Sequence, residues 1–302
     1  MNIVTNLKSQ LKLVPGVQEM VERRRVKKKF ITEIRLLQGR NLSKSAHPSI
    51  IHFSLNKSAT TYVKHLLKIC CEEQGMTTVR MHDYAFASKF PYFDRLSIEE
   101  LQQYQHVFKP TGYLYTAFGG LVQGINNLDQ YRVVLMTRDP RDILVSAYYS
   151  ISYSHEEPTS FSSKNEEFYG VRSQARQQTI DEYVLNSWEK INEILQTYRD
   201  RLLEKYPHVY LTRYEDMVDD FENWFINLLE ACQLDISEAL KDQIIQKHYA
   251  SRPKVEDKQA HVRKGVSGDY KNKLKDETIS FLDEKLADML AYYQYEQTQI
   301  ER

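Results

Sequence analysis

The sequence contains little cysteine, little glycine and no long apolar run, and each shortage excludes a class of protein. Its only cysteines are Cys70, Cys71 and Cys232, two of them adjacent, so neither a disulfide framework nor a zinc knuckle fits. Residues 1–16 lack an apolar core, and no window of about 18 uncharged apolar residues follows, so we expect neither a signal peptide nor a membrane span. The composition therefore predicts a cytoplasmic protein.

Excess charge of either sign is also missing. Lys and Arg together number 41, as do Asp and Glu, which gives a net charge of zero. A neutral chain produces no overall field that attracts nucleic acid or an anionic membrane. We expect neither as a partner, and any anion-binding site must be local.

Short apolar runs alternate with helical patterns along the chain. The runs 49–55 and 131–137 each lead through a polar turn into apolar positions at helical spacing, and the run 208–212 ends in Arg-Tyr-Glu-Asp. Such alternation indicates a parallel sheet with helices on both faces, whose ligands bind beyond the carboxyl ends of the strands. The sequence therefore predicts an α/β fold.

The flanking and connecting segments suggest how this fold is divided. Residues 1–46 are polar and end in turn-forming residues, so we predict a helical lead-in before a single domain, 47–302. Residues 152–180 are polar and serine-rich, which predicts a long loop or lid. Together with 84–105, this segment would form the variable part of a substrate pocket.

The first candidate site is the loop SLNKSATTY, which follows the run 49–55. Backbone N–H groups and the positive end of the next helix would bind a phosphate or sulfate. Lys57 would add a cation, and hydroxyl groups at Ser58, Thr60 and Thr61 would add donors. The same residues could instead be a helix cap with a solvated lysine.

Glycine is absent between Asn41 and Gln74. The standard phosphate loop of ATP-dependent enzymes requires G-x-x-x-x-G-K-[ST], so this segment cannot form one. An ATP-dependent kinase is therefore disfavoured.

Two further segments concentrate basic residues. In TRDPRDILVSAYYS, 137–150, Arg138 could contact a phosphate through two N–H groups, and Ser146 lies two helical turns further on. An Arg–Asp pair bracing the turn is the alternative, and we expect Arg141 and Asp142 to form one. In RKGVSGDYKN, 263–272, the glycines permit a close backbone approach, so its first two residues could cover the same phosphate.

These segments resemble the motifs of cytosolic sulfotransferases. The loop KSATTY is similar to their K-S-G-T-T-W, RDPRDILVSAY to R-N-P-x-D-x-x-x-S-x-Y, and RKGVSGDYKN to R-K-G-x-x-G-D-W-K-N. The resemblance spans about residues 48–275. It implies a single five-stranded parallel sheet of the P-loop nucleotide-kinase-like type. It also implies transfer of a sulfuryl group from 3′-phosphoadenosine-5′-phosphosulfate (PAPS) to a hydroxyl or amine of a small molecule, without a metal, releasing adenosine-3′,5′-bisphosphate (PAP).

The resemblance also implies a set of donor-binding residues. Tyr214 would contact the adenine, on which Tyr62 could stack, whereas Ala59, which replaces a glycine, is expected to avoid a positive φ. The complete set is Lys57, Ser58, Ala59, Thr60, Thr61, Tyr62, Arg138, Ser146, Tyr214, Arg263, Lys264 and Gly265.

The catalytic base is the least determined part of this picture. Many members carry it in a K-T-H segment, but the corresponding segment here, FKPTGY, places Thr111 at the histidine. The candidates are His106, on a predicted strand just before, and His82, which has Asp83 beside it. Either histidine could instead be structural. We favour His82, because a helix leads from the Lys57 loop toward it.

Two alternatives remain open at this level. One is a divergent nucleotide kinase. The other is a non-catalytic sensor of a bisphosphorylated nucleotide, which the missing K-T-H histidine would suit. A preference for a 3′-phosphorylated ligand excludes the first, and turnover excludes the second.

Overall fold

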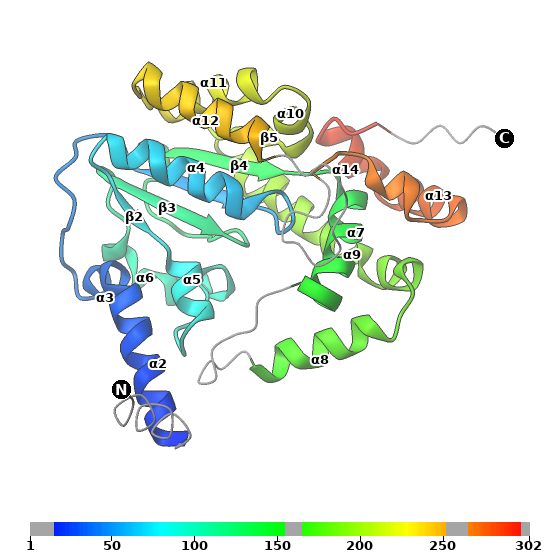
Figure 1. The fold of residues 1–302 in the computed structure, drawn as a ribbon, viewed down its shortest axis with the longest axis horizontal. Helices are drawn as coiled ribbons and strands as arrows, with labels where there is room; N and C mark the ends of the chain where they lie inside the picture. Colours follow the sequence, from blue (N-terminus) through cyan, green and yellow to red (C-terminus); the bar gives the residue numbers. More distant parts are fainter. Residues whose placement is uncertain (1–14, 155–164, 252–264, 297–302) are drawn as a thin grey trace, which may run out of the picture.

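The centre of the computed structural model is a five-stranded parallel sheet in the order β2-β3-β1-β4-β5 (Figure 1). The structure describes residues 15–154, 165–251 and 265–296. The predicted parallel α/β sheet is confirmed, and the three predicted strands correspond to β1, β4 and β5. The strands are β1 (Ile50–Ser54), β2 (Thr77–Val79), β3 (Tyr113–Phe118), β4 (Arg132–Thr137) and β5 (Tyr210–Arg213).

Each inner strand contributes apolar side chains to both faces of the sheet, because successive residues point to opposite sides. In β1, Ile50 belongs to one apolar cluster, while Ile51 and Phe53 belong to the other. This explains why the runs are continuously apolar rather than alternating.

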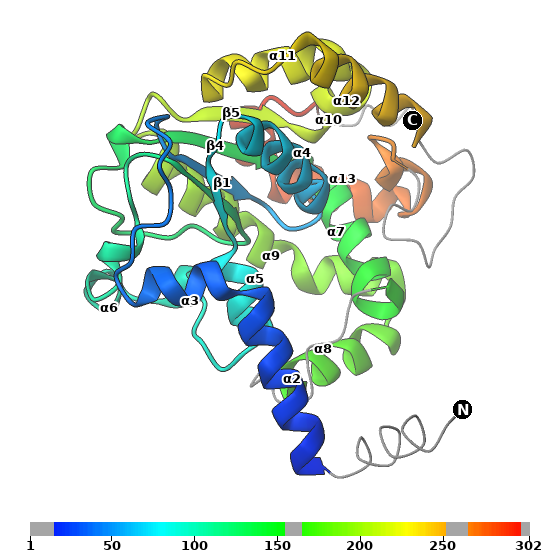
Figure 2. The ribbon, with the colours of Figure 1, turned by 60° about the vertical axis from the view of Figure 1, so that its left-hand side comes forward.

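Helices cover both faces of the sheet (Figures 1 and 2). The cluster around Ile50 contains residues of α4 (Thr60–Glu73), α10 (Tyr214–Asp219), α11 (Phe221–Cys232) and α12 (Glu238–Ala250). The cluster around Ile51 contains residues of α7 (Pro140–Tyr149), α9 (Ile180–Tyr198), α13 (Asp276–Lys285) and α14 (Ala287–Tyr292).

The remaining helices lie at the periphery. The basic run at 23–29 belongs to α2, which projects away from the sheet (Figure 2), whereas Leu36 of α3 is part of the main core. No helix in the described part of the chain is long and apolar enough to cross a membrane. The peripheral helices are α2 (Pro15–Lys29), α3 (Ile31–Leu37), α5 (Met81–Phe86), α6 (Ile98–Gln102) and α8 (Asn165–Arg176).

Two sequence-based predictions about secondary structure are wrong. The segment 152–180 is not one loop, because its described part contains α8 and the start of α9. The segment around His106 is a 3₁₀ turn, Gln105–Val107, and not a strand. The strand of this region is β3, whose six residues are all buried.

Because all five strands run in the same direction, their carboxyl ends meet at one edge of the sheet. The segments that follow β1, β3, β4 and β5 therefore begin at this edge. They contain Lys57, Gly119, Arg138 and Tyr214, respectively.

Candidate functional site

The loop between β1 and α4 has a left-handed backbone without glycine. Lys57 has a φ of 74° and Ala59 a φ of 56°. The expectation that Ala59 avoids a positive φ is therefore wrong. The Ser58 N–H donates to the Leu55 carbonyl at 3.2 Å, and the hydroxyls of Ser54 and Thr60 lie 2.7 Å apart, so internal hydrogen bonds hold the turn.

Ser58 carries a polar group that the protein leaves unused. The residue is fully buried, and its hydroxyl has no hydrogen-bond partner within the described ranges. A buried hydroxyl without a partner costs about 1–3 kcal/mol. Its place beside the amino end of α4, where backbone N–H groups are unpaired, suits an anionic oxygen as the partner.

The half-buried Lys57 lies at the edge of the sheet formed by the carboxyl ends of the strands. Its ammonium group donates to the Ser150 hydroxyl, which follows α7, at 2.5 Å. Burial, and secondarily the charge of Arg138, lowers the pKa of Lys57 to about 8. Burial and a neighbouring positive charge both disfavour the ammonium form of Lys57. A bound anion would stabilise this form.

Arg138 joins the ends of several segments. One guanidinium nitrogen donates to the Lys57 carbonyl at 3.1 Å, and the other donates to Asp142 and to the Val266 carbonyl, both at 3.2 Å. The guanidinium carbon lies 4.1 Å from the centre of the Tyr214 ring. The sequence-predicted residues Lys57, Arg138 and Tyr214 are thus brought together.

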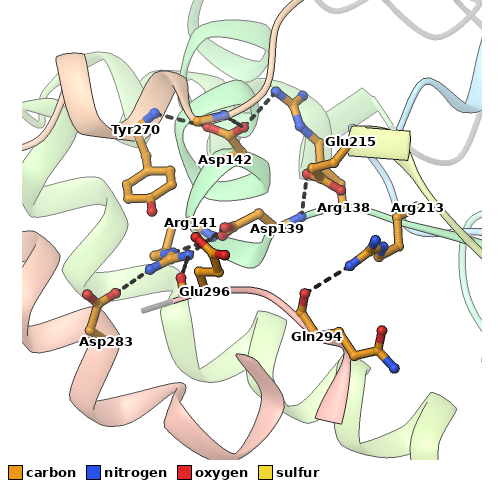
Figure 3. Close-up of polar contacts among 11 residues, drawn as sticks. Arg138, Asp139, Arg141, Asp142, Arg213, Glu215, Tyr270, Asp283, Gln294 and Glu296 are labelled. Carbon is orange, nitrogen blue, oxygen red and sulfur yellow. Dashed lines mark hydrogen bonds and ion pairs between the residues drawn. The ribbon is translucent and has the colours of Figure 1, made fainter. Parts of the chain in front are cut away.

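The prediction that Arg141 pairs with Asp142 is wrong (Figure 3). Arg141 instead contacts Asp139 at 2.6 Å and Asp283 at 2.5 Å. Asp142, in the first turn of α7, pairs instead with Arg138, which lies just before the start of that helix, at 3.2 Å. Adjacent charges in the sequence therefore point to different partners.

Asp142 also anchors the third candidate segment. Its carboxylate accepts hydrogen bonds from the backbone N–H groups of Gly268 at 2.8 Å and Tyr270 at 2.9 Å (Figure 3). Residues 265–272 are thereby fixed beside Arg138. Gly265 is at the start of this segment with a φ of 66°, whereas Arg263 and Lys264 lie outside the described residues.

The other predicted donor residues lie around this centre. Tyr62 is half-buried, and its hydroxyl lies 2.8 Å from Nδ1 of His248. Thr61 is exposed on the first turn of α4. Ser146 is half-buried on α7, one turn before Ser150, which binds Lys57.

The two candidate histidines lie at different places. His82, on α5, borders Gly119 at the carboxyl end of β3. His106 precedes β3, and its Nε2 lies 3.1 Å from the Leu37 carbonyl. Thr111 also lies at the amino end, where it forms a bridge with Pro48 before β1. The structure therefore brings His82, but not His106 or Thr111, to the edge that carries Lys57.

Comparison with known proteins supplies the family. The family model for the sulfotransferase domain matches residues 47–294. The chain belongs to the sulfotransferase domain family. No curated protein matches it.

Comparison with solved structures found proteins similar to this sulfotransferase domain. The mouse sulfotransferase SULT7A1, complexed with PAP, is 14% identical, with a TM-score of 0.54 over 84% of this chain and 89% of that chain. Retinol dehydratase in a complex with retinol and PAP is 15% identical, with a TM-score of 0.44 over 85% and 84% of the two chains. The first similarity shows the P-loop-like fold.

A half-buried glutamate of the sulfotransferase domain was not predicted as a site residue. Glu215 directly follows Tyr214, and its carboxylate accepts the backbone N–H of Asp139 at 3.0 Å (Figure 3). Burial raises its pKa to about 7, although the hydrogen bond from Asp139 opposes the shift. The sequence signal was its place in Arg-Tyr-Glu-Asp, immediately after a strand.

Glu215 should make the stability of the sulfotransferase domain depend on pH. Its pKa is higher in the folded state than its ordinary value of 4.5, so the folded state binds the proton more tightly. Stability is therefore lost as pH rises from about 4.5 through 7. We expect Glu215→Gln to match the wild type near pH 4.5 and to exceed its free energy of unfolding by about 1–2 kcal/mol at pH 8. Chemical denaturation at both pH values, with the exposed Glu222→Gln as control, measures this. A constant difference would contradict the assignment.

Proposed function

We propose that this protein is a PAPS-dependent sulfotransferase that acts on a hydroxyl or amine of a small-molecule acceptor in the cytoplasm. The observation that carries the proposal is the junction of Lys57 and Arg138, which follow neighbouring strands and meet through the 3.1 Å hydrogen bond to the Lys57 carbonyl. Two cations at one sheet edge suit a donor with two separate anionic groups. PAP in the SULT7A1 complex supports the same donor class.

The donor would lie across this junction. The 5′-phosphosulfate would contact the loop residues Lys57, Ser58, Ala59, Thr60 and Thr61, where it would give the Ser58 hydroxyl a partner. The 3′-phosphate would contact Arg138, Ser146, Arg263, Lys264 and Gly265. Tyr62 and Tyr214 would contact the adenine. We also propose that the catalytic domain comprises residues 47–302.

The residues would divide the chemistry between them. The donor supplies the sulfuryl group. The acceptor oxygen or nitrogen forms a bond to sulfur as the bond from sulfur to the phosphate oxygen breaks. Lys57 would stabilise the negative charge that the leaving phosphate gains, and His82 would take the acceptor's proton. The products are the sulfated acceptor and PAP.

Binding and turnover experiments test the proposal separately. Calorimetry should show much tighter binding of PAP than of ADP or ATP, and tighter binding of ATP would favour a nucleotide kinase instead. Mass spectrometry of a panel of phenols, alcohols and amines incubated with PAPS should detect an acceptor that gains one SO₃ group. Tight PAP binding without transfer to any acceptor would favour a sensor.

Arg138 should determine the preference for the 3′-phosphate. Arg138→Lys retains the charge but loses the planar pair of donors. We expect its affinity for PAP to fall by about 1.5–3 kcal/mol, whereas its affinity for adenosine 5′-phosphate stays unchanged. Arg199→Lys, at an exposed ion pair with Asp288, is the control. Equal losses for both nucleotides would place Arg138 away from the 3′-phosphate.

A further inference from the structure

Two consecutive glycines lie where β3 ends, and both are in close contact with polar side chains. A Cβ atom at Gly119 would lie 2.9 Å from Cε1 of His82, and one at Gly120 would lie 2.6 Å from Oδ2 of Asp94. Neither glycine has a positive φ, so backbone conformation does not require them. Their lack of a side chain is what lets His82 and Asp94 approach the end of the strand.

His82 and Asp94 face each other across this point. Nδ1 of His82 lies 3.7 Å from Oδ1 of Asp94, and the two side chains are 28% and 15% exposed. Both atoms are buried, and neither has a hydrogen-bond partner in the part of the chain that the structure describes. Each is therefore available to the other, and a shift of less than 1 Å would make a hydrogen bond.

The imidazole and the start of the Lys57 loop both border Gly119. The position of a Cβ at Gly119 is 3.3 Å from Nε2 of His82 and 3.4 Å from Oδ1 of Asn56, and Asn56 directly precedes Lys57. On one side of the ring, the Tyr92 ring packs with its centroid 4.6 Å away. Nδ1 thus lies beside a carboxylate, and Nε2 lies beside Gly119, which the loop residue Asn56 also borders.

We propose that Asp94 is a positioning residue that makes His82 an effective base. This inference rests on the proposed function. The Nδ1–H of His82 would donate to Asp94, which leaves Nε2 without a proton and directed at the acceptor. Nε2 would then take the proton of the acceptor, and the Asp94 carboxylate would stabilise the imidazolium. No oxidant, metal or further reactant is required.

The other charged groups around His82 have partners of their own. Asp83, its neighbour on α5, contacts Lys64 at 2.9 Å. Arg95 lies over the Tyr92 ring at 4.8 Å. From α9, the buried phenol of Tyr198 is within electrostatic reach of Asp94. Of these groups, Asp94 has the carboxylate that faces Nδ1.

Nitrogen NMR on the PAP-saturated protein tests the pairing without any acceptor. The neutral His82 ring, assigned by its loss in His82→Gln, should carry its proton on Nδ1 in the wild type and shift toward the Nε2–H tautomer in Asp94→Asn. The matched carboxylate variant Asp83→Asn should leave the tautomer as in the wild type. An unchanged tautomer in Asp94→Asn, with PAP affinity and thermal unfolding as in the wild type, overturns the proposal.

Kinetics with an acceptor from the panel tests the consequence. Asp94→Asn should lower kcat/KM by about 10–10³-fold and move the acidic limb of its pH profile to lower pH, since the imidazolium loses its counter-charge. Gly120→Ala, which displaces the carboxylate, should act in the same direction. Gly170→Ala, whose Cβ would meet nothing within 4 Å, should not.

The outcomes separate the two proposals. A loss of activity without any change in the pH profile would indicate a merely structural role and overturn the positioning role. A tautomer shift without transfer to any acceptor would support the pairing and contradict the proposed function.

Discussion

Replacing His82 with alanine should lower kcat about 10²–10⁴-fold and leave the affinity for PAP unchanged, because a general base contributes this much and does not hold the donor. The acidic limb of kcat/KM should disappear in the variant, since only neutral imidazole accepts a proton. Steady-state kinetics across pH, together with calorimetry, measure both effects.

His106→Ala is the matched control for this prediction. Its Nε2 contacts the Leu37 carbonyl near the amino end of β3, so its loss should change kcat much less. A larger loss in His106→Ala would transfer the role to His106. An acidic limb that survives in both variants would leave Asp83, or an amine acceptor that needs no base, as the explanation.

Lys57→Met should lower kcat by two or more orders of magnitude and should lower PAP affinity at neutral pH by a much smaller factor, the one by which wild-type affinity falls as Lys57 becomes neutral above pH 8. The ammonium group matters most when the leaving phosphate oxygen gains charge, and removal of one such group costs about 10²–10³-fold. Lys68→Met, at an exposed pair with Glu72 on the same helix, should behave like the wild type. A kcat close to the wild-type value would refute the role assigned to Lys57.

The pH dependence of PAP binding gives a second readout for Lys57. Because its pKa is about 8 in the protein alone, the side chain becomes neutral as pH rises above 8. A bound anion favours the ammonium form, so binding should take up a proton there and weaken with rising pH. Lys57→Met should lose this proton uptake, which calorimetry in two buffers of different ionisation enthalpy detects.

The sequence predicted the inner part of the fold better than its edges. Continuous apolar runs mark β1 and β4 because helices cover both of their faces. β2 is only Thr77–Val79, lies at the edge of the sheet and has only one buried residue, so no apolar run marks it. β3, YLYTAF, was missed because its tyrosines and its threonine interrupt the aliphatic run that marks β1 and β4, although the structure buries all six residues.

The site was predictable where one short segment determines the geometry. Lys57 and Arg138 directly follow strands, so parallel topology alone places them at the same edge. The partners of Arg138 and Arg141 were not predictable, because Asp283 lies 142 residues from Arg141. The pairing of His82 with Asp94 also depends on how the segment after α5 folds back against Gly120, which local sequence patterns do not encode.

The left-handed turn at Lys57 and Ala59 has a consequence for the entropy of ligand binding. Glycine at these positions would sample many backbone conformations, whereas residues with a side chain sample few, and a left-handed conformation costs them about 1–2 kcal/mol each. This conformational cost arises when the protein folds, and hydrogen bonds such as the one from the Ser58 N–H to the Leu55 carbonyl offset part of it. An anion that binds therefore causes a smaller loss of loop conformational entropy. The residues that replace glycine thus preorganise the Lys57 loop for binding.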